Sequence, residues 1–567
     1  MRIVTGAEDA VAGIFNPRSI AIVGASGRVG ALSWVPLHLL QRYRYSGVLY
    51  PVNPSRESID GIPCYPTLSD VPGPIDLAVV VVNAEATIDA VRQCADLGVR
   101  AAVLPAQGLG EQGGEARERE REMAAYARAR GLRIVGPNTD GVANLVTGAM
   151  ATIQPVFQEM ITPGPVAVVA QSGATAASIV LRLKHAGIGC RYYAAAGNEI
   201  DLGLADFLSF VLQDPDVRMV VSYVEAVRRA GDFVKVAALA AELGKPIALL
   251  KVGASEQGAR TAAAHTGALA GSDAVHDAIF REYGVARVSE LSELTAIAKL
   301  FLARGAPTAR ELGIISVSGG QAGALSDKAV AMGLGVPSLA PRVTAQLAEM
   351  LKFTPPMNPC DLDGQIATEP DIAARAYRAM SSEPGLAMIV YARKLLTGSA
   401  SAESSAALAA VATEPNAVPL AVYAMDGSLN EAERAVYQSA SVPVFDSAHE
   451  LFTAIRSLCG FADRLSRRAD ASRRPSSSGA PAATAALSKA EARALLAGYD
   501  IPVPAEELVT DASSAVAAAE RIGYPVVMKV SSDRILHKTE LAGVAIATPA
   551  ARDGPPLHFS RCRGRIP

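Results

Sequence analysis

The sequence predicts an α/β protein in which several domains of parallel strands and helices follow one another. Short apolar segments rich in Val, Ile and Ala alternate with helical patterns, as is typical of doubly wound sheets. Three of these segments end in a glycine-containing loop that leads into a helix. The 567 residues suffice for about three or four domains, and a chain that is 50% hydrophobic and 19% charged has the composition of a large α/β enzyme.

Charge and cysteine content exclude several other classes of protein. A net charge of −3 gives no overall field that attracts nucleic acid or an anionic membrane. The six cysteines lie far apart and show neither a CxxC pair nor a zinc spacing, which is typical of reduced cytosolic thiols. The first residues lack the apolar core of a signal peptide, and no apolar run reaches the roughly 20 residues of a membrane span. We therefore expect a cytoplasmic protein with no nucleic-acid or membrane partner.

The first domain is expected over residues 13–147. An apolar segment at 19–23 enters the loop Gly24-Ala-Ser-Gly-Arg-Val-Gly30, and a helix is expected to follow. Backbone N–H groups in such a loop, together with the helix N-terminus, can hold a phosphate. The next segment ends in Asn53-Pro54, where a nicotinamide enzyme normally has an acidic residue for the ribose. A Rossmann oxidoreductase is therefore the weaker alternative.

A strand, Ser-Gly and helix unit occurs twice, in domains expected at residues 156–305 and 307–464. Ser172-Gly173 follows the apolar segment 164–170, and Ser318-Gly319-Gly320 follows the segment 312–317. The interval of 318 − 172 = 146 residues has the size of a domain and indicates two copies of one fold. Each helix start directs unpaired N–H groups toward a ligand.

His265 is the leading catalytic candidate. It is one of only seven histidines, it is framed by Ala, Thr and Gly, and it is expected on a loop beyond the strand at 246–250. Two helix N-termini that converge on this ring would stabilise a phosphoryl group bound to it. Glu225, after the segment 217–223, could accept the other ring N–H and fix the tautomer. The alternative for Glu225 is a surface residue that begins a helix at about residue 226.

Several short motifs carry a family resemblance. Gly24-Ala-Ser26, Asn53-Pro54 and Gly-Pro-Asn138 resemble the CoA-binding domain of the succinyl-CoA synthetase superfamily. Gly-Asn-Glu199, Tyr-Val-Glu225 and the segment 262–273 around His265 resemble the NDP-forming acyl-CoA synthetases, which include the ADP-forming acetate–CoA ligases.

The resemblance implies a Rossmann-like CoA-binding domain followed by two flavodoxin-like succinyl-CoA-ligase domains. It also implies that His265 is phosphorylated and that Glu225 orients it. The chain departs from the family at Ala264, where Ser is usual, and at Asp140, since a carboxylate near an anionic ligand is unfavourable. The segment Asn358-Pro-Cys-Asp-Leu362 is similar to an NPxDL loop of the family, but it also fits a simple turn. The binding residues that we assign are Gly24, Ser26, Gly27, Asn53, Pro54, Asn138, Ser172, Gly173, Ser318, Gly319 and Gly320.

The end of the chain predicts a flexible linker and part of another domain. Residues 465–486 are rich in Arg and then in Ser, Pro and Ala, which is typical of a flexible linker. Residues 487–550 open with a capping box at Ser488 and Glu491 and resemble the first part of an ATP-grasp domain, an α+β fold. This resemblance implies that Lys529 contacts nucleotide phosphates and that His537 is a second phosphoryl carrier.

The resemblance to ATP-grasp domains also implies ATP or ADP and Mg²⁺ as cofactors besides CoA. The carboxylates that would hold Mg²⁺ are not found, and the tail at 551–567 matches nothing in the family and is expected to be unstructured. We therefore expect a truncated ATP-grasp domain, and either a homo-oligomer or a partner subunit that supplies the remainder.

The predicted function is that of an NDP-forming acyl-CoA synthetase, an acid–thiol ligase. It would interconvert acyl-CoA, ADP and phosphate with a carboxylic acid, CoA and ATP through a phosphohistidine. The alternative is a non-catalytic protein that binds CoA or acyl-CoA and has lost the ATP-grasp half.

Overall fold

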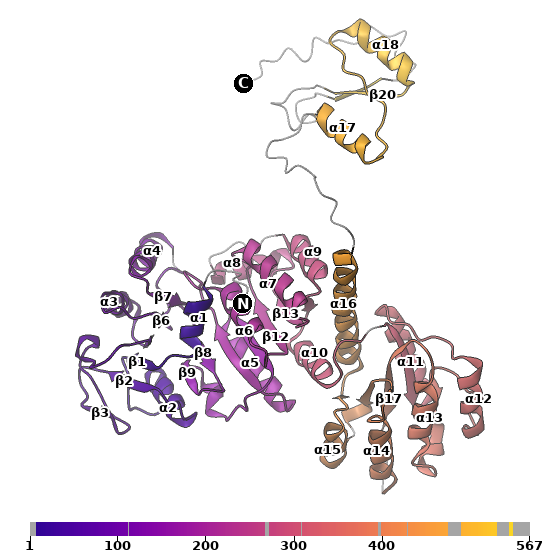
Figure 1. The fold of residues 1–567 in the computed structure, drawn as a ribbon, viewed down its shortest axis with the longest axis horizontal. Helices are drawn as coiled ribbons and strands as arrows, with labels where there is room; N and C mark the ends of the chain where they lie inside the picture. The colour runs from indigo at the N-terminus through magenta and orange to yellow at the C-terminus, as the bar shows by residue number, and fades with distance from the viewer. Residues whose placement is uncertain are drawn as a thin grey trace. The chain divides into compact units, whose positions relative to one another are not determined.

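The computed structural model describes residues 7–111, 113–266, 272–307, 309–394, 399–427, 429–473, 489–529 and 544–547 (Figure 1). The chain divides into two compact units, Met1–Arg473 and Arg474–Pro567. Within the described ranges, no helix combines the length and the apolar character that crossing a bilayer requires.

The first sheet is a parallel sheet of five strands in the order β2-β1-β5-β6-β7. Strands β5 and β6 are buried along their whole length and β1 at all but its last residue, as expected for strands covered by helices on both faces. The helix does not follow the glycine loop at once, because the chain first makes the 3₁₀ turn η1 (Leu32–Trp34), and α2 then begins with Pro36 in its first turn. The elements are β1 (Ser19–Val23), α2 (Val35–Arg42), β2 (Val48–Val52), β3 (Ser58–Ile59), β4 (Ile62–Pro63), η2 (Leu68–Asp70), β5 (Leu77–Val80), α3 (Ala84–Asp96), β6 (Ala101–Val103), α4 (Gly114–Ala129) and β7 (Arg133–Val135).

The second sheet has seven strands in the order β14-β13-β12-β10-β11-β8-β9. Five strands are parallel, and the hairpin β8–β9 adds two antiparallel strands at one edge. This hairpin starts at Gly141, so the second sheet begins inside the range expected for the first domain. The elements are β8 (Gly141–Asn144), β9 (Ala149–Thr152), η3 (Pro155–Gln158), β10 (Val166–Ala170), α5 (Gly173–His185), β11 (Cys190–Ala195), α6 (Leu204–Gln213), β12 (Met219–Val224), α7 (Ala230–Glu242), β13 (Ile247–Lys251), α8 (Glu256–Thr266), α9 (Asp273–Tyr283), β14 (Ala286–Val288) and α10 (Leu291–Arg304).

The first helix, α1 (Glu8–Phe15), packs against the second sheet although it precedes β1. Phe15 contacts Tyr192 of β11 and Phe207 of α6 edge-on, with ring centroids 4.9 and 6.1 Å apart. This aromatic cluster links the start of the chain to the second sheet.

The third sheet is again parallel, with the order β16-β15-β17-β18-β19. The long helix α16 (Ala448–Arg473) follows it and packs beside α10 (Figure 1). Helix α16 therefore extends into the stretch that the sequence predicts as a linker from residue 465. The elements are β15 (Glu311–Ser316), α11 (Gly319–Ala331), α12 (Pro341–Met350), β16 (Cys360–Asp361), η4 (Asp363–Ala367), α13 (Ile372–Ser381), β17 (Leu386–Arg393), α14 (Ser399–Val411), β18 (Leu420–Ala424), η5 (Met425–Gly427), α15 (Glu431–Ser439) and β19 (Val444–Phe445).

The second unit contains two short helices and a strand pair in its described part. These are α17 (Lys489–Gly498), α18 (Ala512–Ile522) and the antiparallel strands β20 (Val526–Lys529) and β21 (Val544–Ala547). Asp511 caps α18 by accepting a hydrogen bond of 2.8 Å from the Ser514 N–H. The predicted capping residue Ser488 lies outside the described residues.

Candidate functional site

The start of α5 lies at the carboxyl edge of the second sheet. Strand β10 ends at Ala170, and Ser172 caps α5 by accepting a hydrogen bond from the Thr175 N–H at 3.3 Å. The predicted order of strand, Ser-Gly and helix is observed here. Ligands of α/β sheets bind at this edge because loops and helix N-termini meet there.

Asp140 lies directly against the first residue of α5. A Cβ atom on Gly173 would lie 2.0 Å from Oδ2 of Asp140, so only glycine fits this position. The amide of Gln154 donates a hydrogen bond of 2.7 Å to the same oxygen. Burial raises the pKa of Asp140, and the bond from Gln154 opposes that rise. A carboxylate thus lies beside the helix N-terminus at which the sequence predicts a phosphoryl group.

The start of α11, at the edge of the third sheet, has a similar neighbour. A Cβ atom on Gly319 would lie 2.7 Å from Oδ2 of Asp361, whereas one on Gly320 would meet open space. Asp361 belongs to the NPxDL segment, and its other oxygen accepts a 2.9 Å hydrogen bond from the Asp363 N–H. The two helix starts belong to different sheets, and their convergence on His265 stays a prediction.

Glu225 is a buried residue at the end of β12, with 5% of its surface exposed. Helix α7 begins only at Ala230, so the alternative of a surface glutamate in the first turn of a helix is wrong. The Glu225 N–H donates to Oε1 of Gln171 at 2.6 Å, and its carbonyl accepts from Nζ of Lys251 at 2.8 Å. Strands β10, β12 and β13 are parallel neighbours, which brings these three residues together.

His265 lies in the last turn of α8, where the sequence predicts a loop. The alanines at 262–264 are strong helix formers and carry the helix through Thr266. The side chain of His265, residues 267–271 and His537 lie outside the described part of the chain, so their roles stay predictions. Lys529 ends β20, where it pairs with Val544 and is exposed.

The glycine loop of the first sheet is shaped by close backbone contacts. Gly24 has φ +83°, and a Cβ there would lie 2.5 Å from the carbonyl oxygen of Val81. Asn53 donates a 2.8 Å hydrogen bond to the carbonyl of Ala25 and accepts one of 2.9 Å from the Ser55 N–H. Gly24 and Asn53 therefore have structural reasons for their identity, since both hold the loop in place.

The outer part of this loop is open. The hydroxyl of Ser26 accepts a 3.1 Å hydrogen bond from the Arg28 N–H, and a Cβ on Gly27 would meet only Ile59, at 3.7 Å. Val29 is 76% exposed. Pro54 lies in the turn after β2. The loop thus offers backbone groups and an apolar side chain to a ligand such as CoA.

Asn138 connects the first two sheets. Its backbone has φ +55°, and its side chain donates to Oδ1 of Asn198 at 3.3 Å. The Asn198 N–H donates to the carbonyl of Pro137 at 2.9 Å, and its side-chain amide donates to Glu111 at 2.9 Å. The Gly-Pro-Asn and Gly-Asn-Glu motifs, which are far apart in sequence, are therefore in contact.

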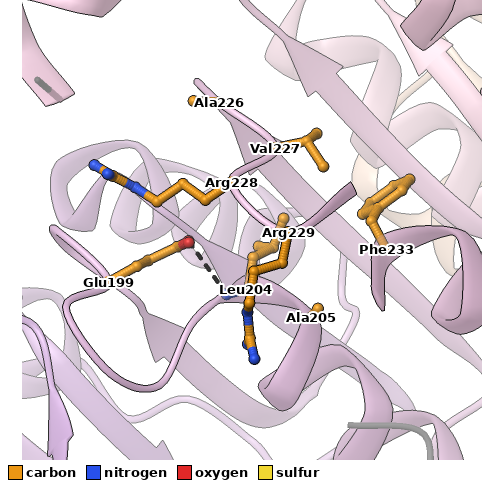
Figure 2. Close-up of a pocket in the computed structure, with 8 residues that line it drawn as sticks. All are labelled: Glu199, Leu204, Ala205, Ala226, Val227, Arg228, Arg229 and Phe233. Carbon is orange, nitrogen blue, oxygen red and sulfur yellow. Dashed lines mark hydrogen bonds between the residues drawn. The ribbon is translucent and has the colours of Figure 1, made fainter. Parts of the chain in front are cut away.

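A small pocket beside Glu225 brings together loops that follow β11 and β12 (Figure 2). Figure 2 shows Glu199 pointing toward Leu204, whose N–H donates to its Oε1 at 3.2 Å. The amide of Gln171 donates to the same Glu199 oxygen at 2.8 Å. Burial raises the pKa of Glu199, and the Gln171 bond and the Arg228 charge oppose that rise. The lining residues are Glu199, Leu204, Ala205, Ala226, Val227, Arg228, Arg229 and Phe233.

Sequence reasoning gave no role to Gln171, Glu199 or Lys251. The available signal was that Gln171 and Lys251 are polar residues at the ends of apolar strands, where a side chain is either exposed or hydrogen-bonded.

The described residues do not provide a magnesium site. No group of three or more His, Cys, Asp or Glu side chains among them could hold a metal ion.

Comparisons with known protein families agree with this architecture. Residues 18–145 match a CoA binding domain, residues 163–301 match the succinyl-CoA ligase like flavodoxin domain, and residues 480–552 match an ATP-grasp domain. This combination defines an acid–thiol ligase that uses CoA and carries part of an ATP-grasp domain.

Individual relatives identify the family. The trans-feruloyl-CoA synthase FCS1 of an unknown prokaryotic organism is 31% identical, over 94% of this chain and 76% of that protein. The ADP-forming acetate–CoA ligase I of Archaeoglobus fulgidus is 30% identical over 94% and 77%. This chain belongs to the family of ADP-forming acyl-CoA ligases, which confirms the predicted class and disfavours both the oxidoreductase and the binding-only alternatives.

A solved structure and two subunits add detail. The dinucleotide-forming acetyl-coenzyme A synthetase 1 of Ca. Korarchaeum cryptofilum, in complex with phosphate and ADP, has a TM-score of 0.71 and 25% identity, over 81% of this chain and 98% of that chain. In Pyrococcus furiosus the acetate–CoA ligase II has separate subunits. The alpha subunit is 29% identical over 78% of this chain and 96% of its own length, and the beta subunit is 46% identical over 10% and 23%.

Proposed function

We propose that this chain interconverts acyl-CoA, ADP and phosphate with a carboxylic acid, CoA and ATP, through a phosphohistidine at His265. The observation that carries the proposal lies at the carboxyl edge of the second sheet. There α5 follows β10, and the buried Glu225 follows the neighbouring strand β12. Family membership supports the reaction.

The first half-reaction needs phosphate and acyl-CoA only. A phosphate oxygen attacks the thioester carbonyl, the C–S bond breaks, and CoA leaves as a thiolate that takes up a proton. A ring nitrogen of His265 then attacks the phosphorus of the acyl phosphate, the P–O bond to the acyl group breaks, and the carboxylate leaves. Because phosphoryl transfer depends mainly on positioning and on stabilising negative charge, the helix N–H groups and the histidine tautomer matter most.

Each predicted residue has a role in this scheme. Glu225 accepts the N–H of the other ring nitrogen of His265, and Ser172-Gly173 and Ser318-Gly319-Gly320 bind the phosphoryl group through helix N–H groups. Gly24, Ser26, Gly27, Asn53, Pro54 and Asn138 form the CoA site.

The second half-reaction transfers the phosphoryl group to ADP. Lys529 holds nucleotide phosphates, and His537 carries the phosphoryl group between His265 and the nucleotide. The family implies Mg²⁺ as a cofactor of the ligase. A partner subunit or a homo-oligomer takes part in this step, and the separate beta subunit of the Pyrococcus furiosus relative supports the partner subunit. The reaction takes place in the cytoplasm.

The acyl group derives from a monocarboxylic acid. Relatives of this chain are named for acetate, 4-hydroxybutyrate and trans-feruloyl-CoA. The parent acid of each of these compounds carries a single carboxyl group. The reaction changes only that group.

A burst of CoA release tests the proposal. The purified chain is mixed with phosphate and a panel of acyl-CoAs, without nucleotide, and free thiol is measured. We expect about one CoA released per chain with the correct acyl-CoA, and none without phosphate. A folded protein that binds CoA but releases none with any acyl-CoA would contradict the proposal.

A further inference from the structure

Two buried polar side chains lie on either side of Glu225. Gln171 follows β10 and is 7% exposed, and Lys251 ends β13 and is 4% exposed. The strand order β13-β12-β10 places one on each side of the end of β12, where Glu225 lies. Burial of such groups is unfavourable unless their hydrogen bonds are satisfied.

The side chain of Gln171 makes four hydrogen bonds, as many as its amide can make in this arrangement. Its Oε1 accepts from the N–H groups of Glu225 and Ala226 at 2.6 and 3.0 Å. Its Nε2 donates to the Ala226 carbonyl at 2.7 Å and to Oε1 of Glu199 at 2.8 Å. The orientation of this amide is therefore fixed, and so is the peptide that it contacts.

Lys251 holds the other side of the same peptide. Its ammonium donates to the Glu225 carbonyl at 2.8 Å and to the carbonyl of Val252. Burial lowers the pKa of Lys251, and the charge of Asp273 opposes that effect. Packing alone does not require a charge at this position, because an apolar side chain is often at least as stabilising in a buried site. The ammonium of Lys251, which bonds to two carbonyl groups, therefore points to a role in fixing the backbone.

We infer that Gln171 and Lys251 are positioning residues that clamp the backbone of Glu225, so that its carboxylate meets the histidine in the reactive geometry. This inference rests on the proposed function, because Glu225 needs fixing only if it orients His265. Displacement of a catalytic group by about 1 Å can cost roughly 100-fold in rate, which gives the clamp a measurable effect.

The clamp also reaches the CoA-binding domain. Gln171 holds Glu199, and the neighbouring Asn198 contacts Asn138 and Glu111 of the first sheet's loops. The position of Glu225 is therefore linked to the loops of the CoA-binding domain through Gln171, Glu199 and Asn198.

The experiment uses Gln171→Glu in the full chain and measures labelling of His265 with radioactive phosphate and acyl-CoA. The new carboxylate can still accept from the N–H groups of Glu225 and Ala226, but its second oxygen faces the Ala226 carbonyl and Glu199 without a proton to donate. We expect labelling to slow by roughly 10- to 100-fold at pH 8. The deficit should shrink toward pH 6, because protonation of the new carboxyl restores one donor.

A matched control is Gln365→Glu in the third sheet's domain. Gln365 is also buried and makes three hydrogen bonds, to Lys352, Met350 and Glu369. The Gln365→Glu substitution should lower thermal stability without changing the labelling rate of the folded protein. Lys251→Met provides a second variant, in which slower labelling is expected without the recovery at low pH.

The outcomes separate the two proposals. Normal labelling in folded Gln171→Glu or in folded Lys251→Met would overturn the clamp and leave the proposed function intact. The clamp would also be overturned if Gln171→Glu slowed labelling only as much as Gln365→Glu does, with no dependence on pH. If the unaltered chain shows no labelling with any acyl-CoA, the proposed function fails and the clamp fails with it.

Discussion

Replacing Asp140 with Asn should strengthen phosphate binding at the start of α5. The Asp140 carboxylate lies against Gly173, the first residue of the helix whose N-terminus is proposed to bind the phosphoryl group. An ionised carboxylate there repels phosphate. Asparagine has nearly the same size, and its oxygen can still accept the hydrogen bond from Gln154. The substitution therefore removes charge with little change in packing.

The expected gain follows from Coulomb's law. Two unit charges 4 Å apart interact by about 4 kcal/mol at an effective dielectric constant of 20 and by about 1 kcal/mol in water. Asp140 is partly buried, so we expect about 1.5–3 kcal/mol, which corresponds to a roughly 10- to 150-fold lower Kd for phosphate.

The pH dependence has a definite sign. Because burial raises the pKa of Asp140, the ionised form is less favourable in the folded chain than in the unfolded chain. The resulting loss of stability is fully present above the folded pKa and disappears as the pH falls from the folded pKa to the unfolded pKa. Asp140→Asn should therefore be at least as stable as the unaltered chain at neutral pH, and the two should bind phosphate more similarly at acidic pH.

Calorimetric titration with phosphate at pH 7.5, without acyl-CoA, measures the effect. Asp89→Asn is the control, because Asp89 is exposed on α3 and its ion pair is with Arg92. Equal or weaker phosphate binding by folded Asp140→Asn would refute the reasoning.

Three further predictions concern catalysis and stability. Glu225→Gln should slow labelling of His265 by roughly 10- to 100-fold, because an outer partner of a reactive histidine is lost. Gly173→Ala should cost about 1–3 kcal/mol in unfolding free energy, and Gly319→Ala less, since the new Cβ would lie 2.0 Å from a carboxylate oxygen in the first case and 2.7 Å in the second. Arg393→Met should cost about 3–5 kcal/mol by leaving Glu433 buried without its charge partner. Burial tends to raise the pKa of Glu433, but a hydrogen bond from Ser401 and the charge of Arg393 outweigh it and lower the pKa. Without Arg393 the Glu433 carboxylate takes up its proton at a higher pH, so the cost of Arg393→Met should shrink as the pH falls from 7 toward 4.

Each of these predictions has a contrary outcome. Labelling of Glu225→Gln at the normal rate would remove that residue from the site. Denaturation midpoints of both glycine variants that equal the midpoint of the unaltered chain would show that neither aspartate resists the added Cβ. A cost of Arg393→Met that stays constant between pH 7 and pH 4 would mean that Glu433 does not depend on the arginine.

The local structure could largely be predicted from sequence. Strands β10 and β15 and the helices after Ser172 and Ser318 follow from apolar runs that end in small polar residues. The glycines after His265 favour a loop, but the alanines before it favour a helix, and the helix extends through Thr266, so the predicted loop position is wrong.

Contacts between distant segments could not be predicted in this way. Gln171 and Lys251 look like ordinary residues after a strand, and only the strand order β13-β12-β10 shows that they flank Glu225. Asp140 was recognised as unfavourable near an anion, but its contact with Gly173 depends on how the loop before β8 packs against α5. Hydrogen-bond partners of buried polar groups depend on the whole sheet.

The most direct test of the phosphohistidine mechanism is to find where phosphate becomes attached. The full chain is incubated with radioactive phosphate and the acyl-CoA that gives a CoA burst, without nucleotide, and the labelled peptide is identified. We expect one acid-labile label per chain on His265, absent from His265→Ala and removed by free CoA together with the acid. A chain that releases CoA but carries its label on another residue, or carries none, would contradict the phosphohistidine mechanism.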